Sequence, residues 1–168
     1  ALGGEYAAPL TGEMIQSVQL QDLDGDGRQE AIAFFRLASE EKPLKIYIFR
    51  PNGEEYETMA VIEGAGTAIN CVDYVQMDEE PFKEIVVSWQ MTAQVHSLAA
   101  YSIGPEQVEE LMRTDYDGYR LCDLDQDNQQ ELVVFRTAGG NVPQAEFYDF
   151  NGVLEKTSEA PLSVGAYV

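Results

Sequence analysis

The sequence predicts an all-β fold of three consecutive four-stranded antiparallel units, arranged like the blades of an incomplete or open propeller. The first observation is an acidic run that occurs twice, as DLDGDGRQE over 22–30 and as DLDQDNQQE over 123–131. Strand-like segments precede and follow both runs. The second observation is a period of about 50 residues, which is typical of a four-stranded blade. The third is an aromatic residue that keeps its place in each unit.

The period comes from equivalent residues in the three units. The first residues of the acidic runs and their counterpart in the middle are spaced by 51 and 50 residues: Asp22, Asp73 and Asp123. A tyrosine before each third-strand turn follows these aspartates by 25, 28 and 25 residues: Tyr47, Tyr101 and Tyr148. The three extra residues in the middle unit predict a longer middle loop, which we place at 73–84.

The first unit spans residues 15–66 and follows an N-terminal arm and entry strand over 1–14. Its predicted strands, rich in β-branched and aromatic residues, cover 15–21, 31–37, 44–50 and 56–63. The segment Pro-Asn-Gly at 51–53 is a hairpin signal between the last two strands. Ile15, Val18 and Leu20 carry the apolar side of the first strand in an imperfect alternation, and we expect Leu20 to face the core.

The second unit spans residues 67–118 and the third spans 119–160, while 161–168 would begin a further strand or form a tail. The predicted strands of the second unit cover 68–72, 84–90, 97–103 and 108–114. The composition of the last of these is compatible with a short helix, but its place in the repeat favours a strand. In the third unit the later strands are predicted at 132–136, 146–150 and around 153–157.

The formal net charge of −20, from 30 acidic and 10 basic residues, excludes several classes of partner. Nucleic acids and anionic membranes bind basic surfaces, so we expect neither as a partner. No segment approaches the ~18 apolar residues of a membrane helix, so we expect no direct membrane insertion. Cys71 is expected to face the core together with Leu20 and Leu121, and Cys122 to face the other way. We therefore predict no disulfide between the two cysteines.

Each acidic run places carboxylates at positions one, three, five and nine of a tight loop between two strands. Alternate acids on such a loop converge on one point, and hard oxygen ligands in that number suit Ca²⁺. The candidate ligands are Asp22, Asp24, Asp26, Glu30, Asp123, Asp125, Asp127 and Glu131. An EF-hand would need an acid at position twelve and flanking helices, which neither run has. The alternative interpretation is two solvated acidic turns without a metal.

The pattern of strand, Asp-x-Asp-x-Asp-Gly-x-x-(Asp/Glu) and strand resembles the FG-GAP or VCBS-type repeats of integrin-α-like β-propellers. The resemblance covers all three units and implies up to two structural Ca²⁺ ions. It also implies that the backbone carbonyls of Arg28 and Gln129 are ligands. Family members of this type are exported or cell-surface proteins, so the resemblance implies an extracellular setting, with a signal or lipid anchor not visible in this chain.

Three features depart from that family pattern. Asn128 stands where the first loop has Gly27, but Asn tolerates the left-handed conformation needed there. In the middle unit Val75 and Met77 stand in place of acids, so we predict no metal in that loop. The Phe-Gly-Gly-Ala-Pro segment is absent, and three blades are too few to close a ring. The chain would therefore belong to a longer protein, associate with other chains, or form an open array.

Other candidate sites are weaker. His96 is the single histidine and lies in a polar turn, and no Gly-x-Ser-x-Gly elbow accompanies it. Cys122 has no neighbouring base, so a spectator thiol is favoured over a nucleophile. Trp89 with Met91 could form a ledge for a sugar or peptide, although packing between blades is favoured. The glycines of 64–67 lack the lysine and helix of a phosphate-binding loop.

The sequence thus predicts a non-catalytic, Ca²⁺-stabilised binding or scaffold module that recognises protein or carbohydrate. One alternative is an accessory part of a polysaccharide-degrading enzyme. Another is a purely structural module that forms homo-oligomers, because unpaired blade edges invite pairing between chains.

Overall fold

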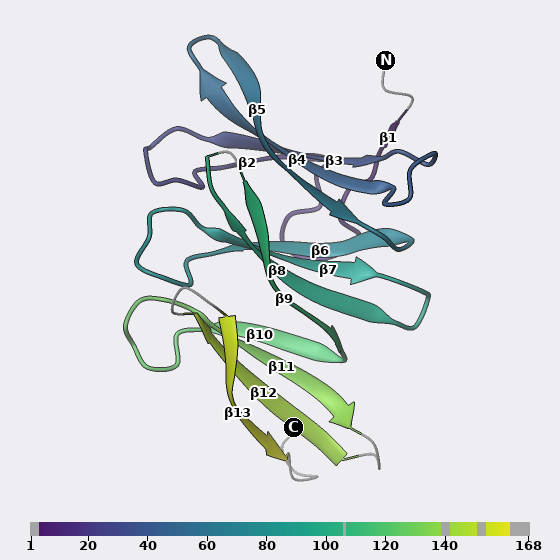
Figure 1. The fold of residues 1–168 in the computed structure, drawn as a ribbon, viewed down its shortest axis with the longest axis vertical. Helices are drawn as coiled ribbons and strands as arrows, with labels where there is room; N and C mark the ends of the chain where they lie inside the picture. The colour runs from purple at the N-terminus through teal and green to yellow at the C-terminus, as the bar shows by residue number, and fades with distance from the viewer. Residues whose placement is uncertain (1–3, 106, 139–141, 151–153, 162–168) are drawn as a thin grey trace.

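The computed structural model describes residues 4–105, 107–138, 142–150 and 154–161, and these ranges form strands and turns without a helix. Three antiparallel sheets are stacked along the long axis of the molecule, in chain order (Figure 1). The all-β prediction is confirmed, and the sheets remain open, as in propeller-like blades. Within the described residues, no helix is long and apolar enough to cross a membrane.

Each sheet is a meander of four consecutive strands. The first sheet contains β2 (Val18–Gln21), β3 (Glu30–Arg36), β4 (Leu44–Asn52) and β5 (Glu55–Gly64), and the short β1 (Glu5–Tyr6) pairs with the far end of β3. The second contains β6 (Ala68–Val75), β7 (Glu84–Gln90), β8 (His96–Ile103) and β9 (Val108–Tyr116). The third contains β10 (Gly118–Cys122), β11 (Glu131–Ala138), β12 (Val142–Phe150) and β13 (Leu154–Pro161).

The repeat predicted the strand at β9 correctly, against its helix-like composition. The pairing of β9 with β8 over eight residue pairs decides its conformation, since tertiary pairing overrides weak helix propensity. Pro161 ends β13, and the rest of the predicted tail lies outside the described residues, as do residues 1–3 of the predicted arm.

Two apolar cores hold the three sheets together. The first core, between the first and second sheets, contains Ile32, Phe34, Ile46, Trp89 and Tyr101 among its members. The second core, between the second and third sheets, contains Val86, Leu98, Leu132 and Val134. Because the second sheet contributes opposite faces to the two cores, its strands β7 and β8 are almost continuously buried.

The middle loop was predicted too long. Strand β6 runs on to Val75 and contains Asp73, whose backbone lies opposite Val86 of β7. The loop therefore covers 76–83, which is eight residues, as are the loops at 22–29 and 123–130. The extra residues belong to the strand, where the register shifts between Ile69 and Cys71.

The predicted orientation of the first strand was also wrong. Ile15, Val18 and Leu20 are exposed, and it is Gln19 that is buried. The side-chain amide oxygen of Gln19 accepts a hydrogen bond of 2.7 Å from the hydroxyl of Tyr74 in the next sheet. The apolar side of β2 thus faces away from the second sheet.

The bulge in β6 leaves Cys71 only half-buried, although it was predicted to face the core. Both Cys71 and Cys122 are free thiols.

Candidate metal centre

The two acidic loops occupy the same place in the first and third sheets, between the first and second strands of each meander. In the loop at 123–130, Asp123, Asp125, Asp127 and Glu131 each offer an oxygen within 4.8 Å of the others. In the loop at 22–29, Asp22, Asp24 and Glu30 do the same. Four carboxylates thus converge in the third sheet and three in the first.

Asp26 is the predicted ligand that does not join its cluster. Its Oδ1 accepts the backbone N–H of Arg28 at 2.7 Å, and its Oδ2 accepts from the Arg28 guanidinium at 3.1 Å. The backbone hydrogen bond from Arg28 lowers the pKa of Asp26, and the guanidinium lowers it further. In the third sheet Gln129 replaces Arg28 and brings no such charge, so Asp127 joins its cluster.

The loop backbones wrap around the first aspartate of each run. The carboxylate of Asp22 accepts the N–H groups of Gly25 and Gly27 at 2.8 and 3.0 Å. Both glycines adopt positive φ. Asp123 accepts the N–H groups of Asp127 and Asn128 at 3.1 and 3.0 Å.

Asn128 takes the left-handed conformation that the sequence predicted for it, with φ of 71°. Gln126 also has a positive φ, of 69°, which is uncommon for a residue other than glycine, asparagine or aspartate. Sequence reasoning did not single out Gln126, and its alignment with Gly25 is the signal that could have done so.

The acid at position nine is the first residue of the next strand and turns back into the loop. Glu30 accepts the N–H of Leu23 at 2.7 Å, and Glu131 accepts that of Leu124 at 2.6 Å. Burial raises the pKa of both carboxyls, and the neighbouring aspartates raise it further. A bound cation would favour the charged form of these acids. The all-oxygen donor set therefore fits a hard cation such as Ca²⁺.

The middle loop keeps the hydrogen bond between the position-two N–H and the position-nine glutamate, but other residues stand at its ligand positions. Glu84 accepts the N–H of Met77 at 2.9 Å, so Met77 corresponds to Leu23 and Gln76 to Asp22. The residues aligned with positions one, three and five are then Gln76, Asp78 and Glu80. The sequence-based alignment, which set Val75 and Met77 at ligand positions, was wrong.

Gln76 and Pro81 make this loop different from the metal-type loops. The side-chain amide of Gln76 donates to the carbonyls of Asp78, at 2.9 Å, and Glu80. Pro81 stands at position six, where Gly27 and Asn128 need positive φ, and its ring fixes φ near −65°. In the middle loop, the side-chain amide of Gln76 thus donates hydrogen bonds to backbone carbonyls. We still predict that this loop binds no metal, now because of Gln76 and Pro81.

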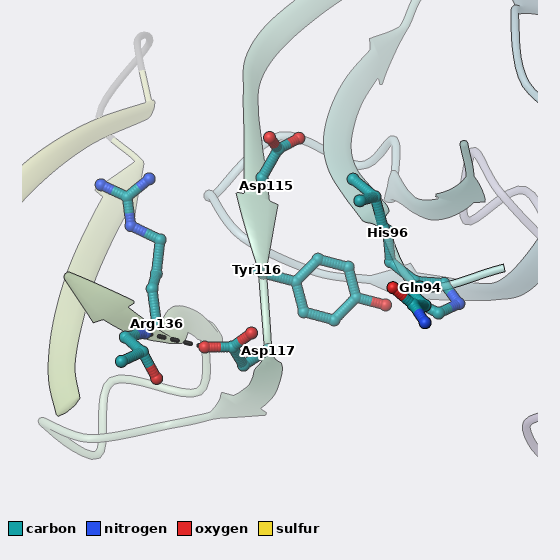
Figure 2. Close-up of a pocket in the computed structure, with 8 residues that line it drawn as sticks. Gln94, His96, Asp115, Tyr116, Asp117 and Arg136 are labelled. Atoms are coloured by element: carbon teal, nitrogen blue, oxygen red, sulfur yellow. Dashed lines mark hydrogen bonds between the residues drawn. The ribbon is translucent and has the colours of Figure 1, made fainter. Parts of the chain in front are cut away.

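A second candidate site is a cleft of about 490 Å³ between the second and third sheets. Figure 2 shows Tyr116 and Asp117 between Arg136 on one side and His96 with Gln94 on the other. The imidazole of His96 lies 6.2 Å from the Tyr116 ring, centroid to centroid. These residues come from separate segments, so no local motif could have revealed the cleft.

The cleft's charged groups are largely paired. Asp117 accepts the backbone N–H of Thr137 at 2.7 Å, drawn as a dashed line in Figure 2. Arg136 pairs with the buried Glu146 at 2.8 Å and donates to the hydroxyl of Thr114 at 3.1 Å. What remains is a polar wall with an aromatic ring, an arrangement that suits a neutral polar ligand such as a sugar.

The remaining candidate residues from the sequence analysis lie in or beside the packed sheets and, in the part of the chain that the structure describes, form no binding site. Trp89 is fully buried in the first core, where its indole N–H donates to the Tyr101 hydroxyl at 3.2 Å, so it packs between sheets and forms no ledge. Met91 packs against the same core. Cys122, the thiol weighed as a nucleophile, is free and half-buried at the end of β10.

Comparison with known proteins informs the fold alone. No protein-family model matches the chain, and no curated protein matches it. Among solved structures, a rhamnogalacturonan lyase of Bacillus licheniformis is similar, with a TM-score of 0.55 and 14% sequence identity. The similarity covers 97% of this chain and 35% of the lyase chain. The three-sheet arrangement described above thus recurs within a much longer protein.

Proposed function

We propose that this chain is a non-catalytic, Ca²⁺-stabilised binding or scaffold module of the propeller type, working outside the cell. The observation that carries the proposal is the convergence of carboxylates in two loops at equivalent places in two sheets. Clustered carboxylates repel one another, and the excess of acidic residues across the chain adds to that repulsion. A cation in each loop would turn this repulsion into attraction and fix the turn between two strands.

The chain's own residues would divide the work as follows. Asp22, Asp24 and Glu30 would hold one ion and Asp123, Asp125, Asp127 and Glu131 the other. Asp26 would join the first cluster by releasing its exposed partner Arg28. The carbonyls of Arg28 and Gln129 would complete the sets, as the resemblance to FG-GAP and VCBS-type repeats implies. The ions would stabilise the fold and would take no part in any reaction.

Calorimetric titration with Ca²⁺, combined with melting curves in Ca²⁺ and in EDTA, tests this proposal. We expect measurable binding and a higher Tm in Ca²⁺. Asp22→Asn and Asp123→Asn should each weaken one of two sites, whereas Asp149→Asn, an exposed acid on β12, should leave both unchanged. Absence of binding heat together with identical melting curves would contradict the proposal.

A second proposal is that the cleft binds carbohydrate, as in an accessory part of a polysaccharide-degrading enzyme. It is supported by the polar and aromatic lining of the cleft and by the similarity to a rhamnogalacturonan lyase. Rhamnogalacturonan fragments are therefore the first ligands to titrate. His96→Ala should abolish their binding, and Tyr56→Phe, at an exposed tyrosine outside the cleft, should not. Equal binding by both variants would place any carbohydrate site elsewhere.

A further inference from the structure

The two outermost sheet faces of the molecule are built like the faces that pack inside it. On the first sheet, the face turned away from the core carries an aromatic row of Tyr6, Phe35, Tyr47 and Phe49, with ring centroids 5.0, 5.7 and 6.0 Å apart. Beside this row lie Val18 and Leu20 of β2, opposite Ala33 and Ala31 of β3. We call this surface the head face. Within the described residues no sheet covers it.

The internal repeat shows that the head face is equivalent to the faces by which the second and third sheets pack on the sheet before them. Tyr47, Tyr101 and Tyr148 each stand 17 residues after the glutamate that begins the second strand of their sheet. Tyr101 is buried in the first core and Tyr148 packs against the second, so both face the preceding sheet. Tyr47 lies on the head face, and the residue there with the pairing of Tyr101 and Tyr148 is Phe49. Phe49 lies opposite Ala31, the residue directly after Glu30, as Tyr101 lies opposite Ile85 and Tyr148 opposite Leu132. That face therefore has the residues by which the other two sheets pack onto their predecessors.

Strand β2 also matches its equivalent in the second sheet, strand β6. Val18 and Leu20 lie opposite Ala33 and Ala31, as Val72 and Tyr74 lie opposite Val87 and Ile85 in the second sheet. Val72 and Tyr74 belong to or pack against the first core. Leu20, in contrast, is 48% exposed. Among the described residues no sheet covers Leu20 as the first sheet covers Tyr74.

The opposite end of the molecule has the complementary feature at Leu124. Leu23, Met77 and Leu124 are equivalent, since the N–H of each donates to the glutamate seven residues later. Leu23 is 0% and Met77 is 1% exposed, each buried in the core that joins its sheet to the next one. Leu124 is 52% exposed. We call the outer face of the third sheet, with Leu124, the tail face.

Backbone hydrogen bonds between successive sheets show how a head and a tail join. The N–H of Lys83 donates to the carbonyl of Leu23 at 2.7 Å, and the N–H of Gln130 donates to that of Gln76 at 2.8 Å. In both cases the donor immediately precedes the glutamate at the start of the second strand. Gln29, which immediately precedes Glu30, would be the N–H donor on the head face. A backbone carbonyl in the loop of Leu124 would be the acceptor on the tail face.

We propose that two copies of this chain associate head to tail, each tail face packing on the partner's head face, to close a ring of six sheets. Head and tail faces differ, so the contact is heterologous, and such contacts close into rings when the rotation allows. Six sheets fall within the typical four to eight blades of a propeller. The inference rests on the sheet faces and does not depend on the proposed metal.

Sedimentation velocity of the 168-residue protein over a range of concentrations tests the ring, at physiological salt to screen the net charge. We expect a dimer. Leu124→Ser and Leu20→Ser replace exposed leucines on the tail and head faces, and each should weaken the dimer at least about tenfold. Val95→Ser is the matched control, because Val95 is 41% exposed but lines the cleft between the second and third sheets.

The two variants distinguish a head-to-tail contact from a symmetric one. A head-to-tail dimer should be weakened by either substitution, whereas a head-to-head dimer would respond to Leu20→Ser alone and a tail-to-tail dimer to Leu124→Ser alone. The runs are made in Ca²⁺ and in EDTA, because the contact sets two acidic loops side by side. A dimer with this behaviour in either buffer supports the proposal. A monomer in both buffers, a larger assembly, or a dimer insensitive to either substitution overturns it.

Discussion

Glu84 is an ionisable residue in an unfavourable place. Its side chain is 2% exposed and accepts one backbone N–H, from Met77. Burial raises the pKa of its carboxyl from the ordinary 4.5 to about 7, although the Met77 hydrogen bond acts in the opposite direction. At neutral pH the folded protein therefore holds a partly charged group that would be better solvated in the unfolded chain.

The pH dependence of stability should reveal Glu84. Because its folded pKa exceeds its unfolded one, the folded state binds more protons between about pH 4.5 and 7, and stability falls as pH rises through that window. Glu84→Gln removes this titration, and the amide oxygen can still accept the Met77 N–H. We expect its stability relative to wild type to improve by on the order of 3 kcal/mol between pH 4.5 and 8.

Urea unfolding of both proteins across that pH range measures the difference. Comparing the change with pH, and not the absolute offset, removes any constant effect of burying the glutamine amide. A parallel course of the two stability curves would show that Glu84 does not titrate in this window.

At the scale of elements, the contact between Gly64 and Trp89 sets how closely β5 approaches the second sheet. A Cβ added at Gly64 would lie 2.3 Å from Cζ3 of Trp89, whose side chain is fully buried in the first core. The end of β5 thus needs glycine because another sheet lies against its backbone.

Gly64→Ala should therefore destabilise the protein by about 1–3 kcal/mol or more through overpacking. Gly104→Ala is a fair control, since the atom nearest its added Cβ would be Cγ of Gln107 at 3.6 Å, an ordinary contact. Thermal unfolding of the two variants makes the comparison. Equal melting temperatures would mean that Trp89 can move away from β5.

Residue patterns predicted the order of strands well but predicted their faces poorly. Strands such as β7 and β8 are mainly apolar in their centres and could be recognised directly, and the repeat settled β9. Alternation on β2 was read as core-facing because Val18 and Leu20 are apolar, yet which face is covered depends on the neighbouring sheet. Asp73 resembled a loop aspartate, and only the pairing of β6 with Glu84 revealed the true register.

The metal-type loops were largely predictable, since their ligands are local in sequence. Seven of the eight predicted carboxylates lie in the two clusters. The displacement of Asp26 depends on a guanidinium two residues away, and the cleft of Figure 2 on segments that only tertiary packing brings together. Local spacing carries no information on either.

For the molecule as a whole, the charge of −20 opposes compaction at low ionic strength. Few lysines and arginines are available for pairing, and several ion pairs, such as Arg50 with Glu57 and Arg113 with Glu110, are partly exposed and worth little each. Long-range repulsion between carboxylates is thus the main electrostatic term.

Salt should therefore stabilise the metal-free protein. Raising NaCl from low to physiological concentration shortens the Debye length to about 8 Å, which screens the repulsion, so the Tm in EDTA should rise. In Ca²⁺ the rise should be smaller, because bound cations have already offset part of the charge. Scanning calorimetry in both series measures this, and a Tm in EDTA independent of salt would contradict it.

The side-chain amide of Gln76 has a consequence for the order in which the molecule comes apart. In a single chain the middle sheet closes its loop with its own atoms and is packed on both faces, whereas each flanking sheet, within the described residues, has one packed face and an acidic loop. Stability in stacked arrays is shared between neighbours. Chelation should therefore speed hydrogen exchange at the β2–β3 and β10–β11 turns and leave β7 and β8 protected, so that the central sheet survives as the last ordered layer.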